Sequence, residues 1–565
     1  MNSSPFELNN WLDQYSRMLA VLFERNLGDF LLRALLTDLQ EAWFRALEKW
    51  QQAPEHYAAI QKQWHTALVR FNGSVSANKD SPATSINDLK TLHTELEQCL
   101  TAMVEETPDL GKDDRRLLRF GVRHLANALA PEYWPVANQD VLNAAIVSNG
   151  MSFFNGMQNF FNDMANSVIG LEVKTANAED FVIGETLAVT PGEVVYENDL
   201  LQLIQYYPNS QQVLQDPLLI VPPWINKFYV LDLNPADSFV QWAVRQGHTV
   251  FMISWVNPDA GNKEFSLQDY LVHGCVQAVS EVRKITGTQQ LNLAGYCIGG
   301  MLATCAAAYF AAETSSPISS LTLLNTMLDY SEPGEVGVFL SERMLTALEQ
   351  HLDTNSVLDG RIMRQAFTML REDRMFWPYI VNNYLLGKAP KSNPVLYWNQ
   401  DATSLPRRML LEFLGDMYRN NALVDRNDYS IAGRPMNLER IDIPVYALAC
   451  HTDHIIPWRS AFHSIQQFSG DVRFVLSDSG HVMGVVNPPN KRQSGYWYEE
   501  RGNKKNDPDS WLQAAEYHSG SWWPHWHDWL SGLQPGRVAA RLPGADGISI
   551  IEPAPGRYVK NGPGT

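Results

Sequence analysis

The ten residues Leu291-Asn292-Leu293-Ala294-Gly295-Tyr296-Cys297-Ile298-Gly299-Gly300 decide the fold. Their first four residues are an apolar run of strand character, which leads directly into the pattern Gly-x-Cys-x-Gly, and the helix-prone residues 301–312 follow. A turn this sharp holds a nucleophile in a strained backbone conformation, so its near neighbours must be small. The pattern therefore predicts a nucleophile elbow with Cys297 at a helix N-terminus, where the helix dipole favours a thiolate.

The same pattern would arise if Cys297 were only a small buried residue and the glycines only allowed close helix packing. Two later segments favour the catalytic interpretation. Asp453 follows the apolar run Val445–Cys450, and His481 follows the run Val472–Leu476. Nucleophile, acid and histidine in this order, each just beyond a strand, are typical of the α/β-hydrolase fold. We expect His481 to deprotonate Cys297 or the incoming nucleophile, and Asp453 to orient the imidazole.

Other apolar runs extend this pattern toward both ends of the chain. Unbroken runs are typical of parallel strands buried on both faces, and segments of helical spacing separate them. The runs are Leu218–Val221, Thr249–Ile253 and Leu321–Leu324, preceded by β-rich runs at 181–190, 193–196 and 201–207. The alternation predicts a mostly parallel α/β sheet. It pauses between residues 329 and 441, and we expect this insertion to form a cap over the active site.

The first 170 or so residues show helical spacing and no chemical motif. Helical patterns cover 8–50, 89–129 and 139–169, and the small polar residues 72–87 predict a loop. We interpret this part as a packing or partner-binding domain. The sequence thus predicts a helical domain over residues 1–175 and an α/β-hydrolase catalytic domain over 176–565, with the cap at about 329–441.

Composition excludes several classes of protein. The 565 residues carry a net charge of −18, which argues against nucleic-acid binding. The five cysteines are scattered and form no disulfide or metal-binding pattern, and the N-terminus shows no signal peptide, so we expect a cytoplasmic protein. The uncharged segment 285–312 contains glycines and amides typical of strand, turn and buried helix rather than a membrane span. An anionic substrate would need a local basic patch, for which Arg361, Arg364 and Arg371 are the first candidates.

A nucleophile elbow at Cys297 implies further groups around it. An oxyanion hole needs two backbone N–H groups, and we expect one from Ile298 and the other from the loop Pro222–Lys227, with Ile225 as the candidate. Cys305 lies on the following helix, and we assign it to the core. We expect no metal site, because no further ligand pair accompanies the clusters His451/Asp453/His454 and His525/His527. A thiol exchanges with a thioester at nearly even free energy, so an elbow cysteine favours acyl transfer from a thioester such as acyl-CoA.

Taken together, these segments resemble the polyhydroxyalkanoate synthases, bacterial polyester polymerases that join (R)-3-hydroxyacyl-CoA units. The matching segments are Leu187–Gly192, Val221–Lys227, Gly295–Gly300, Asn382–Leu385, Tyr397–Thr403, Ser479–His481 and Gly520–Trp523. The similarity runs from about Arg115 to the end of the chain. The chain looks most like the synthases that act without a second subunit and prefer short side chains.

The resemblance implies specific roles. Cys297 would carry the growing chain, with His481 as general base and Asp453 as its partner, and Trp398 would support the cap and a dimer contact. The implied partners are (R)-3-hydroxyacyl-CoA, the growing polyester chain, the granule surface and a second copy in a homodimer. CoA enters with the substrate and leaves as product, so no separate cofactor is expected. The alternatives are a cysteine-dependent acyl-CoA thioesterase or hydrolase of the same fold, and a non-catalytic granule-associated binding protein.

Overall fold

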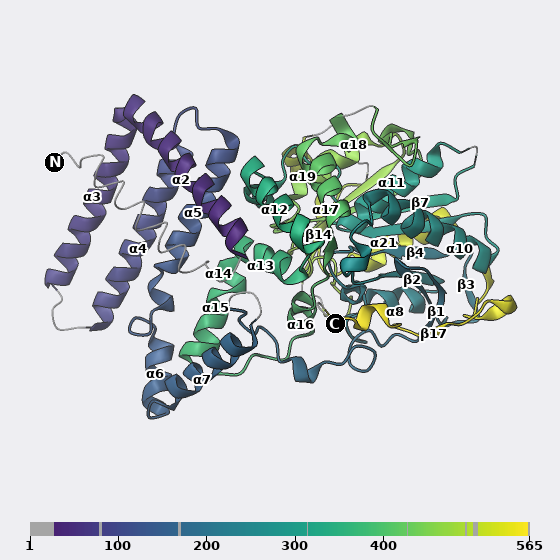
Figure 1. Ribbon diagram of the computed structural model, residues 1–565, viewed down its shortest axis with the longest axis horizontal. Coiled ribbons are helices and arrows are strands. Elements are labelled where there is room, and N and C mark those ends of the chain that lie inside the picture. The colour runs from purple at the N-terminus through teal and green to yellow at the C-terminus, as the bar shows by residue number, and fades with distance from the viewer. Residues whose placement is uncertain are drawn as a thin grey trace. The chain divides into compact units, whose positions relative to one another are not determined.

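The computed structural model describes residues 28–77, 82–167, 171–313, 315–425, 428–491, 494–500 and 507–562 (Figure 1). The chain forms two compact units. Unit 1 comprises residues 1–177, 335–351 and 364–391, and unit 2 comprises residues 178–334, 352–363 and 392–565. The insertion expected at 329–441 is therefore divided between the units, because two of its segments pack with the N-terminal helices.

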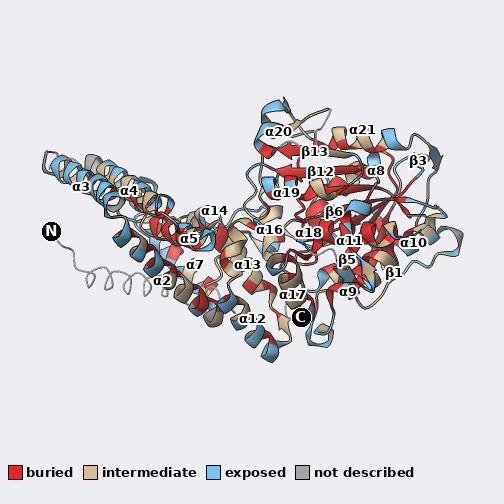
Figure 2. Ribbon diagram, turned by 90° about the horizontal axis from the view of Figure 1, so that it is seen from above, coloured by how far each residue is buried: buried red, intermediate tan, exposed pale blue. Residues whose placement is uncertain are grey.

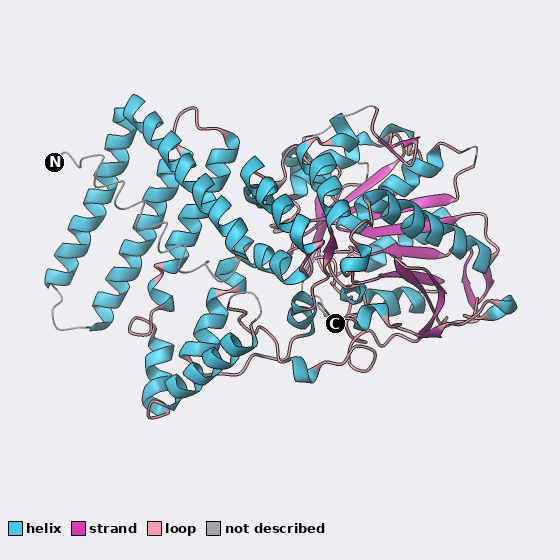
Figure 3. Ribbon diagram, in the orientation of Figure 1, coloured by secondary structure: helices cyan, strands magenta, loops and turns pink. Residues whose placement is uncertain are grey.

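Unit 2 is built on one large sheet, which among the described residues has eleven strands in the order β15-β14-β13-β12-β7-β6-β4-β5-β2-β1-β17 (Figure 3). These strands are β1 (Gly192–Glu197), β2 (Leu201–Tyr206), β4 (Leu218–Val221), β5 (Val250–Trp255), β6 (Leu291–Tyr296), β7 (Ile318–Leu324), β12 (Val445–Cys450), β13 (Val472–Ser477), β14 (Tyr496–Tyr498), β15 (Glu516–His518) and β17 (Glu552–Pro553). The strands from β13 to β5 pair in parallel, and those on either side pair antiparallel. The predicted α/β sheet is confirmed.

The register of the parallel strands brings their carboxyl ends to one edge. Val221 pairs with Gly295, Tyr296 with Leu324, and Cys450 with Ser477. Strands β4, β5, β6 and β12 are buried along their whole length, as their unbroken apolar runs predict (Figure 2). Residues that follow β4, β6, β12 and β13 therefore share one end of the sheet.

The helices of unit 2 cover this sheet. They include α8 (Phe239–Arg245), α9 (Leu267–Asp269), η5 (Tyr270–Val276), α10 (Gln277–Thr286), α11 (Ile298–Ala311), α19 (Trp458–Ser464) and α21 (Trp523–Leu533). Several tryptophans are core residues with bonded indole N–H groups. Trp522 donates to Gly484 O, and Trp526 donates to Thr322 Oγ1. The uncharged segment 285–312 is strand, turn and buried helix, and within the described ranges no helix is long and apolar enough to cross a membrane.

Unit 1 is helical. Its helices from the N-terminal region are α2 (Gly28–Gln52), α3 (Pro54–Ala77), α4 (Pro82–Glu105), α5 (Lys112–Ala128), α6 (Gln139–Val147) and α7 (Met151–Asn166). The loop predicted at 72–87 is wrong for residues 72–77 and 82–87, because α3 continues to Ala77 and α4 begins at Pro82, while residues 78–81 lie outside the described residues. Proline is well tolerated at the first helical position, and a glycine such as Gly73 costs a helix only about 1 kcal/mol. Residues 8–27 of the helical pattern predicted at 8–50, and residues 168–169 of the pattern predicted at 139–169, lie outside the described residues.

The insertion adds to unit 1 the helix η6 (Gly334–Phe339), most of α12 (Glu342–Asn355), part of α13 (Gly360–Leu370), α14 (Glu372–Met375), α15 (Trp377–Tyr379) and η7 (Ile380–Leu385). Helix α7 lies directly against η7: a Cβ on Gly156 would fall 1.8 Å from Tyr384 O. Tyr384 also donates a hydrogen bond to the buried carboxylate of Asp163 at 2.8 Å. The Asn382–Leu385 motif therefore serves to hold α7.

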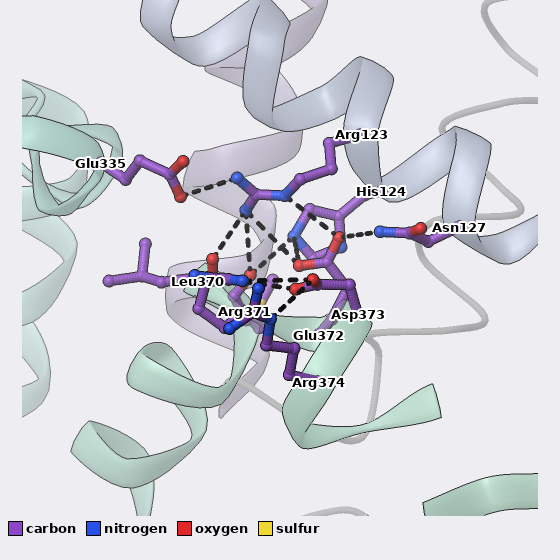
Figure 4. Close-up of polar contacts among 10 residues, drawn as sticks. Arg123, His124, Asn127, Glu335, Leu370, Arg371, Glu372, Asp373 and Arg374 are labelled. Atoms are coloured by element: carbon purple, nitrogen blue, oxygen red, sulfur yellow. Dashed lines mark hydrogen bonds and ion pairs between the residues drawn. The ribbon is translucent and has the colours of Figure 1, made fainter. Parts of the chain in front are cut away.

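A buried ionic cluster joins α5 to the insertion (Figure 4). Arg123 donates to Glu335 Oε2 at 2.7 Å and lies 3.3 Å from Glu372 Oε1, and Asn127 donates to the same Glu372 oxygen at 2.8 Å. Nε2 of His124 lies 3.0 Å from Met369 O. Burial raises the pKa of Glu372, whereas burial lowers the pKa of His124 to about 3. Unit 1 is thus held together by charged groups as well as by apolar packing.

Candidate active site

Cys297 occupies the sharp turn between β6 and α11. Its φ of 56° and ψ of −126° are a conformation that L-residues rarely adopt. The neighbouring glycines are required by close approach: a Cβ on Gly299 would lie 2.3 Å from Val221 O, and one on Gly295 would lie 2.4 Å from Gly300 Cα. The amide of Cys297 donates to Leu324 O at 2.8 Å, which ties the turn to β7. This is the backbone geometry of a nucleophile elbow.

His481 and Asp453 follow the ends of β13 and β12. Nδ1 of His481 lies 2.6 Å from Oδ2 of Asp453, whose side chain is fully buried. The other carboxylate oxygen, Oδ1, accepts the amides of Ile455 and Ile456 at 2.8 and 3.0 Å. The carboxylate is therefore held from one side by the backbone and directs its second oxygen at the imidazole, which fixes the ring orientation.

The charge of Cys297 also acts on the imidazole of His481. Burial, the largest single effect, disfavours the imidazolium, but the charges of Asp453 and Cys297 outweigh it and raise the pKa of His481 to about 10. The arrangement therefore favours the imidazolium form of His481, which interacts with the carboxylate of Asp453 and the sulfur of Cys297.

The backbone of His481 is held by two residues that the sequence did not single out. Asn325 Nδ2 donates to His481 O at 2.6 Å, and Tyr296 OH donates to the same oxygen at 3.3 Å. Both residues lie at the ends of strands, Tyr296 directly before Cys297 and Asn325 directly after β7. Their position beyond apolar runs is the signal that could have identified them.

Two tyrosines, the buried Tyr330 and the half-buried Tyr418, lie within electrostatic reach of Cys297. Burial raises the pKa of Tyr418, and the charge of Cys297 adds to the effect. The pKa of Tyr330 is raised in the same way, with Tyr418 contributing, and the two rings lie 4.7 Å apart. Both phenols therefore stay neutral beside the sulfur.

The loop after β4 lies against the elbow. The Cβ position of Gly299 meets the backbone of Val221 and Pro222, and Trp255 Nε1 donates to Pro222 O at 2.9 Å. Ile298 is the first residue of α11, and no backbone hydrogen bond outside the helices and strands of the described residues has the amide of Ile225 or Ile298 as its donor. An oxyanion hole requires two such N–H groups, and its assignment to these two residues stays a prediction.

Other residues singled out from the sequence contact partners other than Cys297, Asp453 and His481 in the described structure. Cys305 is buried, lies 3.6 Å from Met301 Sδ, and burial raises its pKa to about 12, so it is a core residue. Trp398 is also buried, and its Nε1 donates to Lys227 O at 2.7 Å. Ring nitrogens of His525 and His527 lie 3.0 Å from Tyr446 OH and a nitrogen of His248, respectively. Among the described side chains, no group of three or more His, Cys, Asp or Glu is arranged to hold a metal ion.

The arginines considered for an anionic substrate each contact a carboxylate. Arg361 contacts Asp359 at 2.5 Å, Arg364 contacts Glu172 at 3.0 Å, and Arg371 contacts Asp373 at 3.1 Å. These short ion pairs reduce the positive charge that each arginine could offer to a phosphate. The structure therefore gives no support to a basic patch made of these residues.

Comparison with known proteins places the chain in a family. Residues 70–243 match the model of the poly-beta-hydroxybutyrate polymerase (PhaC) N-terminus, and residues 216–488 match the α/β-hydrolase fold. A poly(3-hydroxyalkanoate) polymerase of Methylorubrum extorquens is 37% identical over 543 residues, which are 93% of this chain and 89% of that protein. The chain belongs to the poly(3-hydroxyalkanoate) polymerase family. The expected membership of this family and the expected α/β-hydrolase fold are confirmed, whereas the expected likeness to the single-subunit synthases of short side chains stays a prediction.

Other polymerases show similar agreement. The polymerase subunit PhaC of Rhizobium etli is 40% identical over 81% of this chain and 71% of its own length. The subunit PhaC of Cupriavidus necator is 38% identical over 79% of this chain and 76% of its own. A solved structure of a putative hydrolase from Agrobacterium vitis is 14% identical, with a TM-score of 0.31 over 52% of this chain and 91% of that one. As a polymerase, the chain is an enzyme of the acyltransferase class.

Proposed function

We propose that this polymerase joins (R)-3-hydroxyacyl groups from CoA thioesters into a polyester, through an acyl thioester on Cys297. The observation that carries the proposal is the position of His481, bonded to Asp453 through Nδ1 and interacting with Cys297 at the elbow. An imidazole oriented in this way can move a proton between the sulfur, the leaving group and the incoming alcohol.

In the acylation step, the Cys297 thiolate attacks the thioester carbonyl of the substrate. The tetrahedral oxyanion would be bound by the amides of Ile298 and Ile225. As the intermediate collapses, the bond from carbon to the CoA sulfur breaks, and His481 gives its proton to the departing sulfur. The products are CoA, an acyl group on Cys297 and a neutral imidazole.

In the transfer step, the neutral imidazole of His481 accepts the proton of the 3-hydroxyl group of a second hydroxyacyl unit. The hydroxyl oxygen attacks the acyl carbonyl on Cys297, an ester bond forms, and the sulfur leaves as a thiolate. The charge of Asp453 stabilises the imidazolium that forms again. Because one thioester replaces another in the first step, the acyl group stays activated for the second. CoA serves as part of the substrate, and we propose no further cofactor.

The decisive experiment follows CoA release and insoluble polyester together, using purified protein and (R)-3-hydroxybutyryl-CoA. We expect both products in proportion. Cys297→Ala should abolish both, while the matched variant Cys305→Ala should keep at least half of the activity. CoA release without polymer would support a thioesterase, and neither product would support a binding protein. Polymer synthesis by Cys297→Ala would disprove the assignment of the nucleophile.

We also propose that the polymerase contacts its polyester granule through α6 and α7. Apolar side chains on these helices are more than half exposed, and they are Ile146, Val147, Met151, Phe154, Met157 and Phe161. These side chains belong to two consecutive helices, and exposed apolar side chains grouped in this way mark a site of interaction. Residues 139–166 contain no lysine or arginine, which suits an uncharged polyester better than an anionic lipid surface.

The granule contact can be tested by sedimentation with washed polyhydroxybutyrate granules. We expect the double variant Phe154→Ser, Phe161→Ser to lose at least half of its bound fraction while CoA release on soluble substrate stays within about twofold. The control is Val69→Ser on α3, which is as exposed as Phe161 but lies on another helix. If both variants bound granules equally well, the proposal that α6 and α7 contact the granule would be wrong. Sedimentation equilibrium of the same proteins tests the homodimer, which we propose from the family resemblance.

A further inference from the structure

Lys227 is a buried lysine in the loop region after β4, with a side chain 3% exposed. Its Nζ donates to Val559 O at 2.8 Å and to Asn561 O at 2.5 Å, and it lies 3.7 Å from Oδ1 of Asp401. Burial lowers the pKa of Lys227, and the charge of Asp401 opposes this. A buried ammonium is tolerated only where its donors are paired, so these partners hold the side chain in one place.

The backbone of the same loop is attached to the segment that carries Asp401. Trp398 Nε1 donates to Lys227 O at 2.7 Å, and Asn226 forms an isolated β-bridge with Ala402. Tyr229 OH donates to the second oxygen of Asp401 at 2.9 Å. Residues 398–402 thus contact the loop through both backbone and side chains.

Asn257, just beyond the end of β5, makes a second connection between the same segments. Its Nδ2 donates to Gly562 O at 2.9 Å and to Asn561 O at 3.3 Å, and its Oδ1 accepts the amide of Ser404 at 2.9 Å. Lys227 and Asn257 therefore each contact both the 559–562 segment and the 398–404 segment.

The amide expected to bind the oxyanion belongs to the loop that these contacts hold. Ile225 is two residues before Lys227 and is only partly buried. An oxyanion donor must be held within about 0.5 Å of its working position, and the free amide of Ile225 gives the loop no anchor of its own. The loop is fixed instead at Pro222 by Trp255 and at its other end by the contacts of Lys227.

We propose that Lys227 is a positioning residue that sets the Ile225 amide for oxyanion binding, and that the 559–562 segment completes the active site by holding Lys227. This inference rests on the proposed function. The ammonium touches no reacting atom, and it acts by fixing the end of the loop.

The test compares Lys227→Met with the wild-type chain in two reactions at Cys297. CoA release from (R)-3-hydroxybutyryl-CoA passes through an oxyanion, whereas alkylation by iodoacetamide, followed by peptide mapping, does not. We expect kcat to fall about 10- to 100-fold with KM changed less than about threefold, because a displacement of about 1 Å costs this much. The alkylation rate of Cys297 should stay within about twofold of the wild-type rate.

A second variant tests the role of the 559–562 segment. A chain that stops after Tyr558 should show the same fall in kcat, and adding Lys227→Met to it should cause no further fall, because the two changes remove one interaction. The matched control is Lys560→Met, an exposed lysine of the same segment, which should keep wild-type rates. Asn257→Asp keeps the acceptor for Ser404 and removes the donors to the segment, so it provides the test should Lys227→Met not fold.

The outcomes separate the two proposals. Unchanged kcat in Lys227→Met, or an equal fall in CoA release and alkylation, would overturn the positioning role. Additive losses in the combined variant would overturn the role of the 559–562 segment. A wild-type chain that releases no CoA would refute the proposed function itself and this inference with it.

Discussion

The carboxylate of Asp453 holds His481 through one oxygen and is itself held through the other. Oδ2 lies 2.6 Å from His481 Nδ1, while Oδ1 accepts the amides of Ile455 and Ile456. The acid is therefore fixed in orientation before it meets the imidazole. Because Oδ1 is held by the backbone, replacing the carboxylate by an amide changes only the group that faces His481.

Asp453→Asn should lower kcat by about three to four powers of ten. The asparagine oxygen would keep the backbone amides as partners, so its NH2 group would face Nδ1 and select the wrong tautomer of His481. CoA release measures the effect, and thermal unfolding should show a stable fold. The control is Asp507→Asn, an exposed helix cap on α20 (Pro508–Ala514), which should keep full activity. A loss of less than tenfold in Asp453→Asn would argue against the acid's role.

The imidazolium of His481 should govern the reactivity of Cys297. The raised pKa of His481, about 10, keeps the ring charged at neutral pH, and this charge favours the thiolate. We expect iodoacetamide to alkylate Cys297 more slowly in His481→Gln than in the wild-type chain at pH 6.5, because the variant lacks this charge. Identical rates for the two proteins would contradict the ion pair.

Gly299→Ala should damage both stability and activity. Its Cβ would lie 2.3 Å from Val221 O and 2.6 Å from Pro222 O, and backbone atoms cannot move aside cheaply. We expect a loss of about 1–3 kcal/mol in the free energy of unfolding and at least a tenfold fall in CoA release. Gly532→Ala on α21 is the matched control, because nothing lies within 4 Å of its Cβ position. Gly532→Ala should leave the free energy of unfolding unchanged or raise it by up to about 1 kcal/mol.

The cluster on α5 should make unit 1 sensitive to acid. Burial lowers the pKa of His124 to about 3, so between pH 6.5 and 3 the unfolded chain binds a proton that the folded chain does not. Stability due to neutral His124 is complete above pH 6.5 and is lost as the pH falls toward 3. His124→Gln removes this contribution, so the loss of stability from pH 7.5 to 5.5 should shrink by about 1.4 kcal/mol.

Denaturant unfolding at the two pH values measures this difference. The raised pKa of Glu372 works in the opposite direction, but that residue is present in both proteins and its effect remains in each curve. The exposed His65 on α3 supplies the control variant His65→Gln, which should leave the difference unchanged. An equal loss of stability in wild type and His124→Gln would show that His124 is not buried in its neutral form.

Local sequence patterns were sufficient to predict the sheet and the nucleophile elbow. The strands β4 and β12 have the bounds that their apolar runs predict, and the glycines around Cys297 are required by atoms that lie nearby in sequence or on adjacent strands. The predicted loop was wrong at residues 72–77 and 82–87, because residues of weak helix propensity there continue the helices α3 and α4. Intrinsic helix propensity predicts conformation poorly wherever the packing of neighbouring helical turns decides it.

By itself, the sequence determined the α/β sheet, the elbow and the order of Cys297, Asp453 and His481, because each depends on a short run of residues and on where a strand ends. Only the tertiary structure decided which segments of the insertion join the N-terminal helices, that Arg364 contacts Glu172, and that Lys227 reaches the carbonyls of Val559 and Asn561. The contacts of Lys227 join residues 332 and 334 positions apart. Their energies depend on burial and on distance in space, which no local pattern of residues encodes.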